Sequence, residues 1–173
     1  MIFQNISTFS NIHDYLPIVN GAIITDLVVI LRVVLGQIKS KSLTSWYKKY
    51  GIAGVLADVL SITIGVIITR FIYPFIFTKY SLITFIGLAV IVQLIHDLLF
   101  AQLFYSIPRG KSEILDTFKD YATEFGPVIL LADAAMIIST ILIGSFLSTQ
   151  SINTNIIVLL VILYLVPYFI YSI

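Results

Sequence analysis

Five titratable side chains lie inside long apolar stretches of this sequence, where charge is unfavourable. They belong to Asp26, Asp58, His96, Asp97 and Asp133. An aspartate at the centre of a membrane helix costs about 2.5 kcal/mol or more on insertion scales, so each one requires a proton, a partner or water. Histidine changes its charge close to neutral pH, which suits it to proton relay. The five residues therefore predict a polar seam inside a helix bundle, and one interpretation of that seam is a pathway for protons or cations.

The same aspartates also have a purely structural interpretation, in which they tie neighbouring helices together. Partners for them are available in the apolar stretches: Thr25, Arg32, Ser61, Thr63, Arg70, Gln93 and Ser139. Hydrogen bonds between membrane helices contribute only about 0.6 kcal/mol on average. Because no ion-selective motif accompanies the aspartates, we favour the structural interpretation and keep the ion pathway as the alternative. Arg32 and Arg70 lie near predicted helix ends, where long basic side chains snorkel toward the membrane surface.

The sequence offers little for enzyme chemistry. It contains two histidines and no cysteine, which excludes thiol nucleophiles, thiolate metal sites and disulfides. It has no HExxH motif, no nucleophile elbow and no phosphate-binding glycine loop. We therefore expect no enzyme, no catalytic residue, and no cofactor or metal site. The formal net charge of +1 gives no reason to expect nucleic acid as a partner.

The composition is that of a membrane protein. Of 173 residues, 59% are hydrophobic and 11% are charged, against roughly 45–50% and 25% in soluble domains. A spanning helix needs about 20 mainly apolar residues. Five such stretches are present, at about 16–38, 51–73, 82–104, 127–147 and 155–173. We expect an all-α membrane protein in which a bundle of about five transmembrane helices forms one domain over residues 1–173, surrounded by the lipid bilayer.

Basic residues gather in the loops on one side of these stretches. The loops after the first and third stretches contain Lys39, Lys41, Lys48, Lys49, Arg109, Lys111 and Lys119, and the loops on the other side contain only Lys79. Basic loops remain in the cytosol. The N-terminus is therefore expected outside or in the lumen, and the C-terminus in the cytosol. No basic segment precedes the first stretch, so no cleavable signal peptide is expected.

The loop at 105–126 has a helical pattern of its own. In KSEILDTFKDYATEF, the apolar residues recur at helical spacing and the opposite face is charged. One interpretation is a short amphipathic helix that lies in the membrane interface. The other is a cytosolic extension of the fourth span that packs against its neighbours.

Two parts of the sequence match each other and suggest an internal duplication. The segment 50–60 can be laid over 125–135, which places Asp58 on Asp133. Upstream, 23–28 matches 94–99 and places Asp26 on Asp97. The prediction is a repeated helical hairpin, at about 16–73 and 82–147, followed by a terminal helix at about 155–173. Because each copy crosses the membrane twice, the two copies would have the same orientation.

Small residues in two of the spans predict where helices approach one another closely. These residues are Gly51, Ala53, Gly54 and Ala57 in the second span and Ala132, Ala134 and Ala135 in the fourth.

Part of the second half resembles a known kind of protein. The segments that carry the resemblance are HDLLF (96–100), PRG (108–110), LDTFKDYATEFG (115–126) and LADAAM (131–136). They are similar to small, multi-spanning, uncharacterised membrane proteins of large double-stranded DNA viruses of aquatic eukaryotes. The resemblance implies a viral origin and residence in a viral or virus-modified membrane, and it carries over no catalytic residue.

The expected function is therefore a structural or assembly role in a membrane, plausibly a viral one. Its expected partners are other membrane proteins or further copies of the chain. The alternative is a small channel or transporter for protons or cations that uses the intramembrane aspartates.

Overall fold

The computed structural model describes residues 2–173, and five of its helices are long and apolar enough to cross a membrane. They are α1 (Tyr15–Val34), α3 (Ile52–Ile76), α4 (Leu82–Ser106), α6 (Val128–Leu147) and α7 (Ile152–Ile170). The other elements are a 3-10 helix, η1 (Ile12–Asp14), and two shorter helices, α2 (Lys41–Tyr50) and α5 (Glu113–Phe125). The predicted all-α bundle of about five spans is confirmed. The chain is an integral, multi-pass membrane protein.

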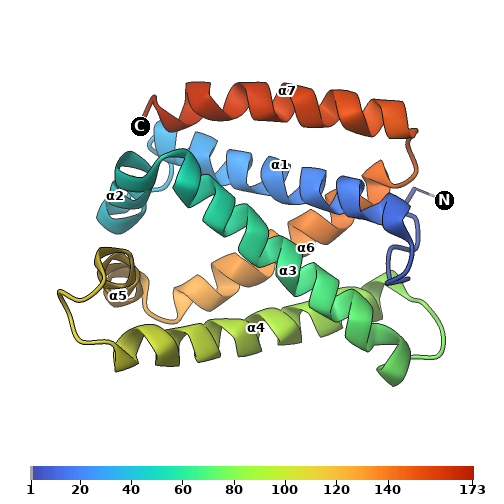
Figure 1. The fold of residues 1–173 in the computed structure, drawn as a ribbon, viewed down its shortest axis with the longest axis horizontal. Helices are drawn as coiled ribbons and strands as arrows, with labels where there is room; N and C mark the ends of the chain where they lie inside the picture. The colour runs from blue at the N-terminus through green and yellow to red at the C-terminus, as the bar shows by residue number, and fades with distance from the viewer. Residues whose placement is uncertain (1) are drawn as a thin grey trace.

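The long helices form a bundle in which two of them cross between two edges. In Figure 1, α1 and α7 run along one edge and α4 along the other, while α3 and α6 cross between them. The most extensive helix contact is between α1 and α6. The N- and C-termini lie at opposite ends of the bundle, and α2 and α5 lie at the end where the C-terminus is found. We call this the basic end, because the lysine-rich loops lead into α2 and α5.

The closest backbone approach in the bundle is the crossing of α1 and α6. A Cβ atom added to Gly21 would lie 2.6 Å from the carbonyl oxygen of Thr140 and 3.0 Å from the backbone nitrogen of Gly144. A Cβ on Gly144 would in turn lie 3.1 Å from Cα of Ile18. The prediction of close packing at small residues of α3 and α6 is wrong for the alanines Ala53, Ala57, Ala132 and Ala135, which are exposed.

Arg70 corrects a second expectation, because its side chain does not snorkel but is fully buried. Its Nη2 atom donates hydrogen bonds to Oδ2 of Asp14, at 3.3 Å, and to the carbonyl oxygen of Asn11, at 3.0 Å. The guanidinium also lies 4.3 Å from the ring centre of Tyr15. Residues before α1 thus fold over this end of the bundle and supply an ion pair that the apolar pattern of α3 did not indicate. Arg32, by contrast, is exposed as expected.

Short helices precede α3 and α6 in the same way. The amphipathic helix expected in the loop at 105–126 is present as α5, whereas α2 was not predicted. Ser40 accepts a hydrogen bond from the backbone of Leu43 at the start of α2, and Ser112 accepts one from Leu115 at the start of α5. Each helix ends at a glycine with positive φ, +50° at Gly51 and +56° at Gly126. These shared features are what a duplication would produce, and the duplication itself remains a prediction.

The α1–α6 crossing gives a first prediction. In Gly21→Ala, the new methyl group meets backbone atoms that cannot move aside, so we expect a loss of roughly 1–3 kcal/mol of stability. The matched control is Gly87→Ala in α4, where an added Cβ meets nothing within 4 Å and improves helix propensity. Thermal unfolding in detergent, followed by circular dichroism, measures both. Equal melting temperatures for the two variants would contradict the proposed tight crossing.

Candidate functional site

The four intramembrane aspartates occupy one layer of the bundle. Asp58 and Asp133 lie near the starts of α3 and α6, while Asp26 and Asp97 lie before the ends of α1 and α4. At 1.5 Å of rise per residue, each is about 8–14 Å from the helix terminus at the basic end. We call these four residues the acid layer. The sequence predicts Asp58 and Asp133 about two turns from the basic ends of their helices and Asp26 and Asp97 nearer mid-depth. That these ends face the cytosol stays a prediction.

The carboxylates of the acid layer form a row in which neighbours feel one another's charge, without a hydrogen bond between them in residues 2–173. Asp58 is close enough to both Asp26 and Asp133 for their charges to repel, and Asp133 is also within reach of Asp97. The row therefore runs from α1 through α3 and α6 to α4. Among residues 2–173, no lysine or arginine forms an ion pair with any of the four. Four adjacent negative charges are highly unfavourable in such surroundings, so the layer needs protons or cations.

Two carboxylates of the layer accept hydrogen bonds from α2. The hydroxyl of Tyr47 donates to Oδ1 of Asp26 at 3.2 Å, and Nε1 of Trp46 donates to Oδ2 of Asp58 at 3.0 Å. Asp26 is fully buried, and its second oxygen has no hydrogen-bond partner in the described part of the chain. The two donors fix α2 over the layer and leave part of it unsatisfied.

The other two carboxylates are not tied to neighbouring helices. Oδ1 of Asp97 accepts a hydrogen bond from Nε2 of Gln93 at 2.7 Å and lies 3.1 Å from Nδ1 of His96, both on its own helix. Within residues 2–173, no hydrogen bond is found to Asp133. Of the partners predicted for a purely structural role, only Gln93 bonds to an aspartate of the layer.

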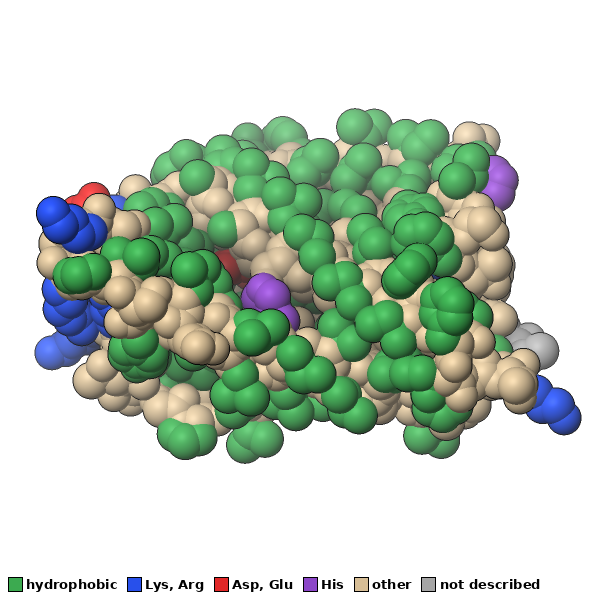
Figure 2. All heavy atoms as spheres, turned by 60° about the horizontal axis from the view of Figure 1, so that its bottom comes forward, with side chains coloured by type: hydrophobic (Ala, Val, Ile, Leu, Met, Phe, Trp, Pro, Cys, Tyr) green, Lys and Arg blue, Asp and Glu red, His purple; other side chains and the backbone are tan. Residues whose placement is uncertain are grey.

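His96 lies at the rim of the layer rather than within its row. Its side chain is 43% exposed, against 12% for Asp97, and its ring stacks on Phe100 with 6.0 Å between ring centres. In Figure 2, the hydrophobic face over α4 is interrupted by a histidine, with an acidic side chain in the hollow beside it. The structure thus brings all five predicted residues to one region, with the histidine beside Asp97 at the exposed side of the layer.

Two tyrosines of the short helices complete the site, and the sequence analysis did not single them out. Burial raises the pKa of Tyr47, and the charges of Asp26 and Asp58 raise it further. Burial also raises the pKa of Tyr121 in α5. The negative charges of Asp133, Asp58 and Glu124 raise it further. Both phenols therefore keep their protons at neutral pH. In the sequence, the feature that could have identified these tyrosines is the helical spacing of aromatic residues on one face of each short helix.

The helices α2 and α5 are held together at both ends in an antiparallel arrangement. The carboxylate of Glu124, at the end of α5, accepts hydrogen bonds from the backbone of Lys41 at 2.9 Å and of Ser42 at 2.8 Å, at the start of α2. At the opposite ends, Nζ of Lys49 lies 2.5 Å from Oε1 of Glu113. We call α2 and α5 the helix pair.

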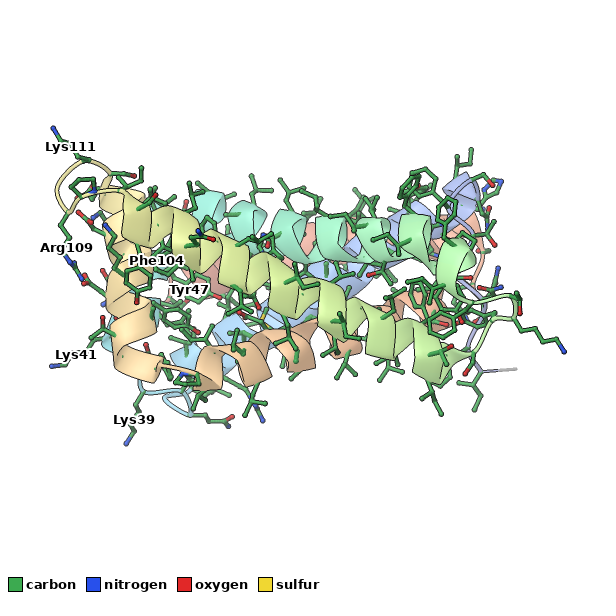
Figure 3. The ribbon with its side chains drawn as sticks, turned by 90° about the horizontal axis from the view of Figure 1, so that it is seen from below. Lys39, Lys41, Tyr47, Phe104, Arg109 and Lys111 are labelled. Atoms are coloured by element: carbon green, nitrogen blue, oxygen red, sulfur yellow. The ribbon has the colours of Figure 1, made fainter. Side chains whose placement is uncertain are left out.

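The helix pair separates the acid layer from the basic surface. Between its two ends, the rings of Trp46 and Phe118 pack with 5.0 Å between their centres. In Figure 3, Tyr47 lies inside this end of the bundle, whereas Lys39, Lys41, Arg109 and Lys111 extend outward from it. The pair therefore presents hydrogen-bond donors and aromatic rings inward, while the basic residues of α2 and of the adjoining loops extend outward.

The histidines and acidic residues of the described chain do not converge as metal ligands. Within residues 2–173, no group of three or more of them is placed to hold a metal ion. Comparisons with known proteins find no matching family model, no similar curated protein and no similar solved structure. The function is therefore inferred from the geometry of the site.

The bonds made by Glu124 give a second prediction. Hydrogen bonds from Ser42 lower the pKa of Glu124 below its usual 4.5, and the bond from the side chain has a larger effect than the bond from the backbone. The interaction is therefore complete above pH 4.5 and is lost as the pH falls through the lowered pKa. In Glu124→Gln, we expect the amides at the start of α2 to exchange hydrogen severalfold faster at neutral pH, by hydrogen–deuterium exchange.

Glu113→Gln is the matched control, because it removes the same charge at the other end of the helix pair. It should leave exchange at the start of α2 unchanged. Equal exchange in both variants and the original protein would show that Glu124 does not hold α2.

Proposed function

We propose that this protein is a small proton channel or transporter in which the acid layer supplies the proton-binding positions. The observation that carries the proposal is the row of four carboxylates, contributed by four helices, without a lysine or arginine paired to any of them in residues 2–173. A buried group of this kind is a functional candidate because its charge is so unfavourable in a bilayer. Each carboxylate can take up and release a proton, since it is an acceptor when ionised and a donor once protonated.

Two features favour protons over metal cations. The described residues do not provide three converging ligands for a metal ion, whereas a proton requires only two neighbouring acceptors. Hydrogen-bond donors from α2 reach two of the carboxylates. A small monovalent cation remains the alternative substrate.

Polar contacts continue from the acid layer toward the other end of the bundle. Oγ1 of Thr140 donates to Oγ1 of Thr25, next to Asp26, at 3.3 Å. Farther along α1, Nδ2 of Asn20 donates to the carbonyl oxygen of Asn155 at 2.9 Å. Beyond the layer, α1 and α6 pack closely, so transfer across the whole bundle would require these helices to move apart. At the basic end the helix pair covers the layer, so this conformation fits a closed state, and proton entry from that end would require the pair to move aside.

Proton flux into liposomes tests the proposal. Full-length protein is reconstituted with a pH-sensitive dye inside, and a potassium gradient with valinomycin sets the membrane potential. Asp58→Asn and Asp133→Asn should reduce flux to the level of protein-free liposomes, because each interrupts the row. Asp120→Asn is the matched control, since Asp120 pairs with Arg109 on the surface, and it should retain flux.

The outcomes distinguish the proposals. Flux of sodium or potassium without protons would assign the layer to a monovalent cation. An absence of flux under every gradient, from protein that is correctly folded, would overturn the transport proposal. It would favour the structural alternative.

The structural alternative is an assembly component of a membrane, including a viral or virus-modified one. The observation that favours it is closure of the bundle at both ends, by the helix pair and by the Arg70–Asp14 ion pair. Other membrane proteins or further copies of the chain would be its partners. The resemblance to viral membrane proteins supports the same interpretation.

The proposed orientation gives a further prediction. With the N-terminus outside and the basic end in the cytosol, Lys111→Cys should react with a membrane-impermeant thiol reagent only from the cytosolic side. Lys79→Cys, in the loop between α3 and α4, should react only from outside. Because the sequence has no cysteine, each variant carries a single reactive thiol. Reaction of both from the same side would contradict the orientation.

A further inference from the structure

The outer surface of α2 contains a depression surrounded by lysines. It is lined by Lys39, Ser40, Lys41, Thr44, Ser45, Lys48 and Lys49. No step of the proposed proton path uses it, because it lies on the side of α2 that faces away from the acid layer.

Helical spacing creates this surface. Thr44, Ser45 and Lys48 follow Lys41 by three, four and seven residues, which places all of them on one face of α2. The opposite face carries Trp46 and Tyr47, both buried. Because those two side chains bond to the acid layer, α2 cannot rotate freely, and the lysine face keeps a fixed direction.

Three of the four lysines have no paired carboxylate in the described part of the chain. Lys49 pairs with Glu113, but Lys39, Lys41 and Lys48 have no salt bridge within residues 2–173. Glu124, the nearest acid at the start of α2, directs its oxygens to backbone amides. Like charges on one face of a short helix repel one another, so a bound anion would stabilise this arrangement.

The position of the depression identifies the source of that anion. It lies at the basic end, where Figure 3 shows Lys39 and Lys41 extending beyond the ends of the spans. Juxtamembrane clusters of lysine at this level meet the phosphates of the lipid headgroups. Hydroxyl groups of the same face, such as that of Ser45, add hydrogen-bond donors for phosphate oxygens. We propose that the depression binds the headgroup of an anionic phospholipid from the surrounding leaflet.

Native mass spectrometry of the full chain in detergent tests this proposal. The protein is titrated with phosphatidylglycerol, and with phosphatidylcholine as the neutral comparison. Each lysine near an anionic lipid strengthens attachment roughly fivefold. The triple variant Lys39→Gln, Lys41→Gln, Lys48→Gln should therefore lose at least about tenfold in affinity for phosphatidylglycerol and bind phosphatidylcholine as before.

Two further variants separate the site from general charge and from misfolding. Lys79→Gln, Arg109→Gln, Lys111→Gln removes the same charge elsewhere and should keep the preference for phosphatidylglycerol. Lys39→Arg, Lys41→Arg, Lys48→Arg keeps the charge at the site and should also retain it. Equal losses in the two glutamine variants, or no loss in the first, would overturn the proposal.

A competition arm tests the source of the anion. Millimolar inorganic phosphate should not displace phosphatidylglycerol if the lipid itself is the ligand, because the acyl chains hold it in the surrounding detergent. Displacement by phosphate alone would assign the depression to a soluble anion and would overturn the lipid assignment.

Discussion

The unfavourable energy of burying like charges governs the arrangement of this bundle. Four carboxylates lie in one layer of a protein otherwise made of apolar helices, and none is neutralised by a nearby lysine or arginine within residues 2–173. Such a layer is tolerable only if donors reach it and protons or cations occupy it. The position of α2 follows from the first requirement, since Trp46 and Tyr47 bond directly to Asp58 and Asp26. The second requirement connects the layer to function.

The helix pair covers a region at the basic end that the spanning helices do not fill. The crossing of α3 and α6 brings their starts to separate parts of the basic end (Figure 1). The short helices α2 and α5 occupy that region and link to each other through Glu124 and Lys49. Their aromatic side chains cover the acid layer, and the lysines of α2 face the opposite way. The helix pair, which is one helix thick, thus separates the acid layer on its inner side from the lysines on its outer side.

Some of this architecture could be predicted from the sequence, and the physical reasons differ from element to element. The five spans were predictable because hydropathy over about 20 residues is a strong signal. Asp58 and Asp133 were predictable as neighbours in depth because each follows a glycine by seven residues. In contrast, α2 was missed because four lysines in and before a ten-residue segment suggested a solvated loop.

Partners from distant parts of the chain were beyond the reach of sequence patterns. Arg70 was expected at the membrane surface because its helix pattern says nothing about Asp14, which lies 56 residues earlier. The role of Tyr47 depends on the direction in which α2 leaves α1, and no local spacing specifies that direction. The exposure of His96 likewise depends on which face of α4 meets α6.

The pairing of α1 with α6 also determines the order in which this protein can mature. The main partner of the first span is synthesised more than a hundred residues after it, and Asn20 finds Asn155 only on the last helix, 135 residues later. Until α7 is made, Asn20 lacks this partner, whereas Asp26 can bond to Tyr47, which follows it by 21 residues. The backbone bond from Gln4 to Ser145 is equally delayed. Assembly of the five spans is therefore completed only once α7 is in place, and a chain that stops before α7 would leave Asn20 without its bond to Asn155.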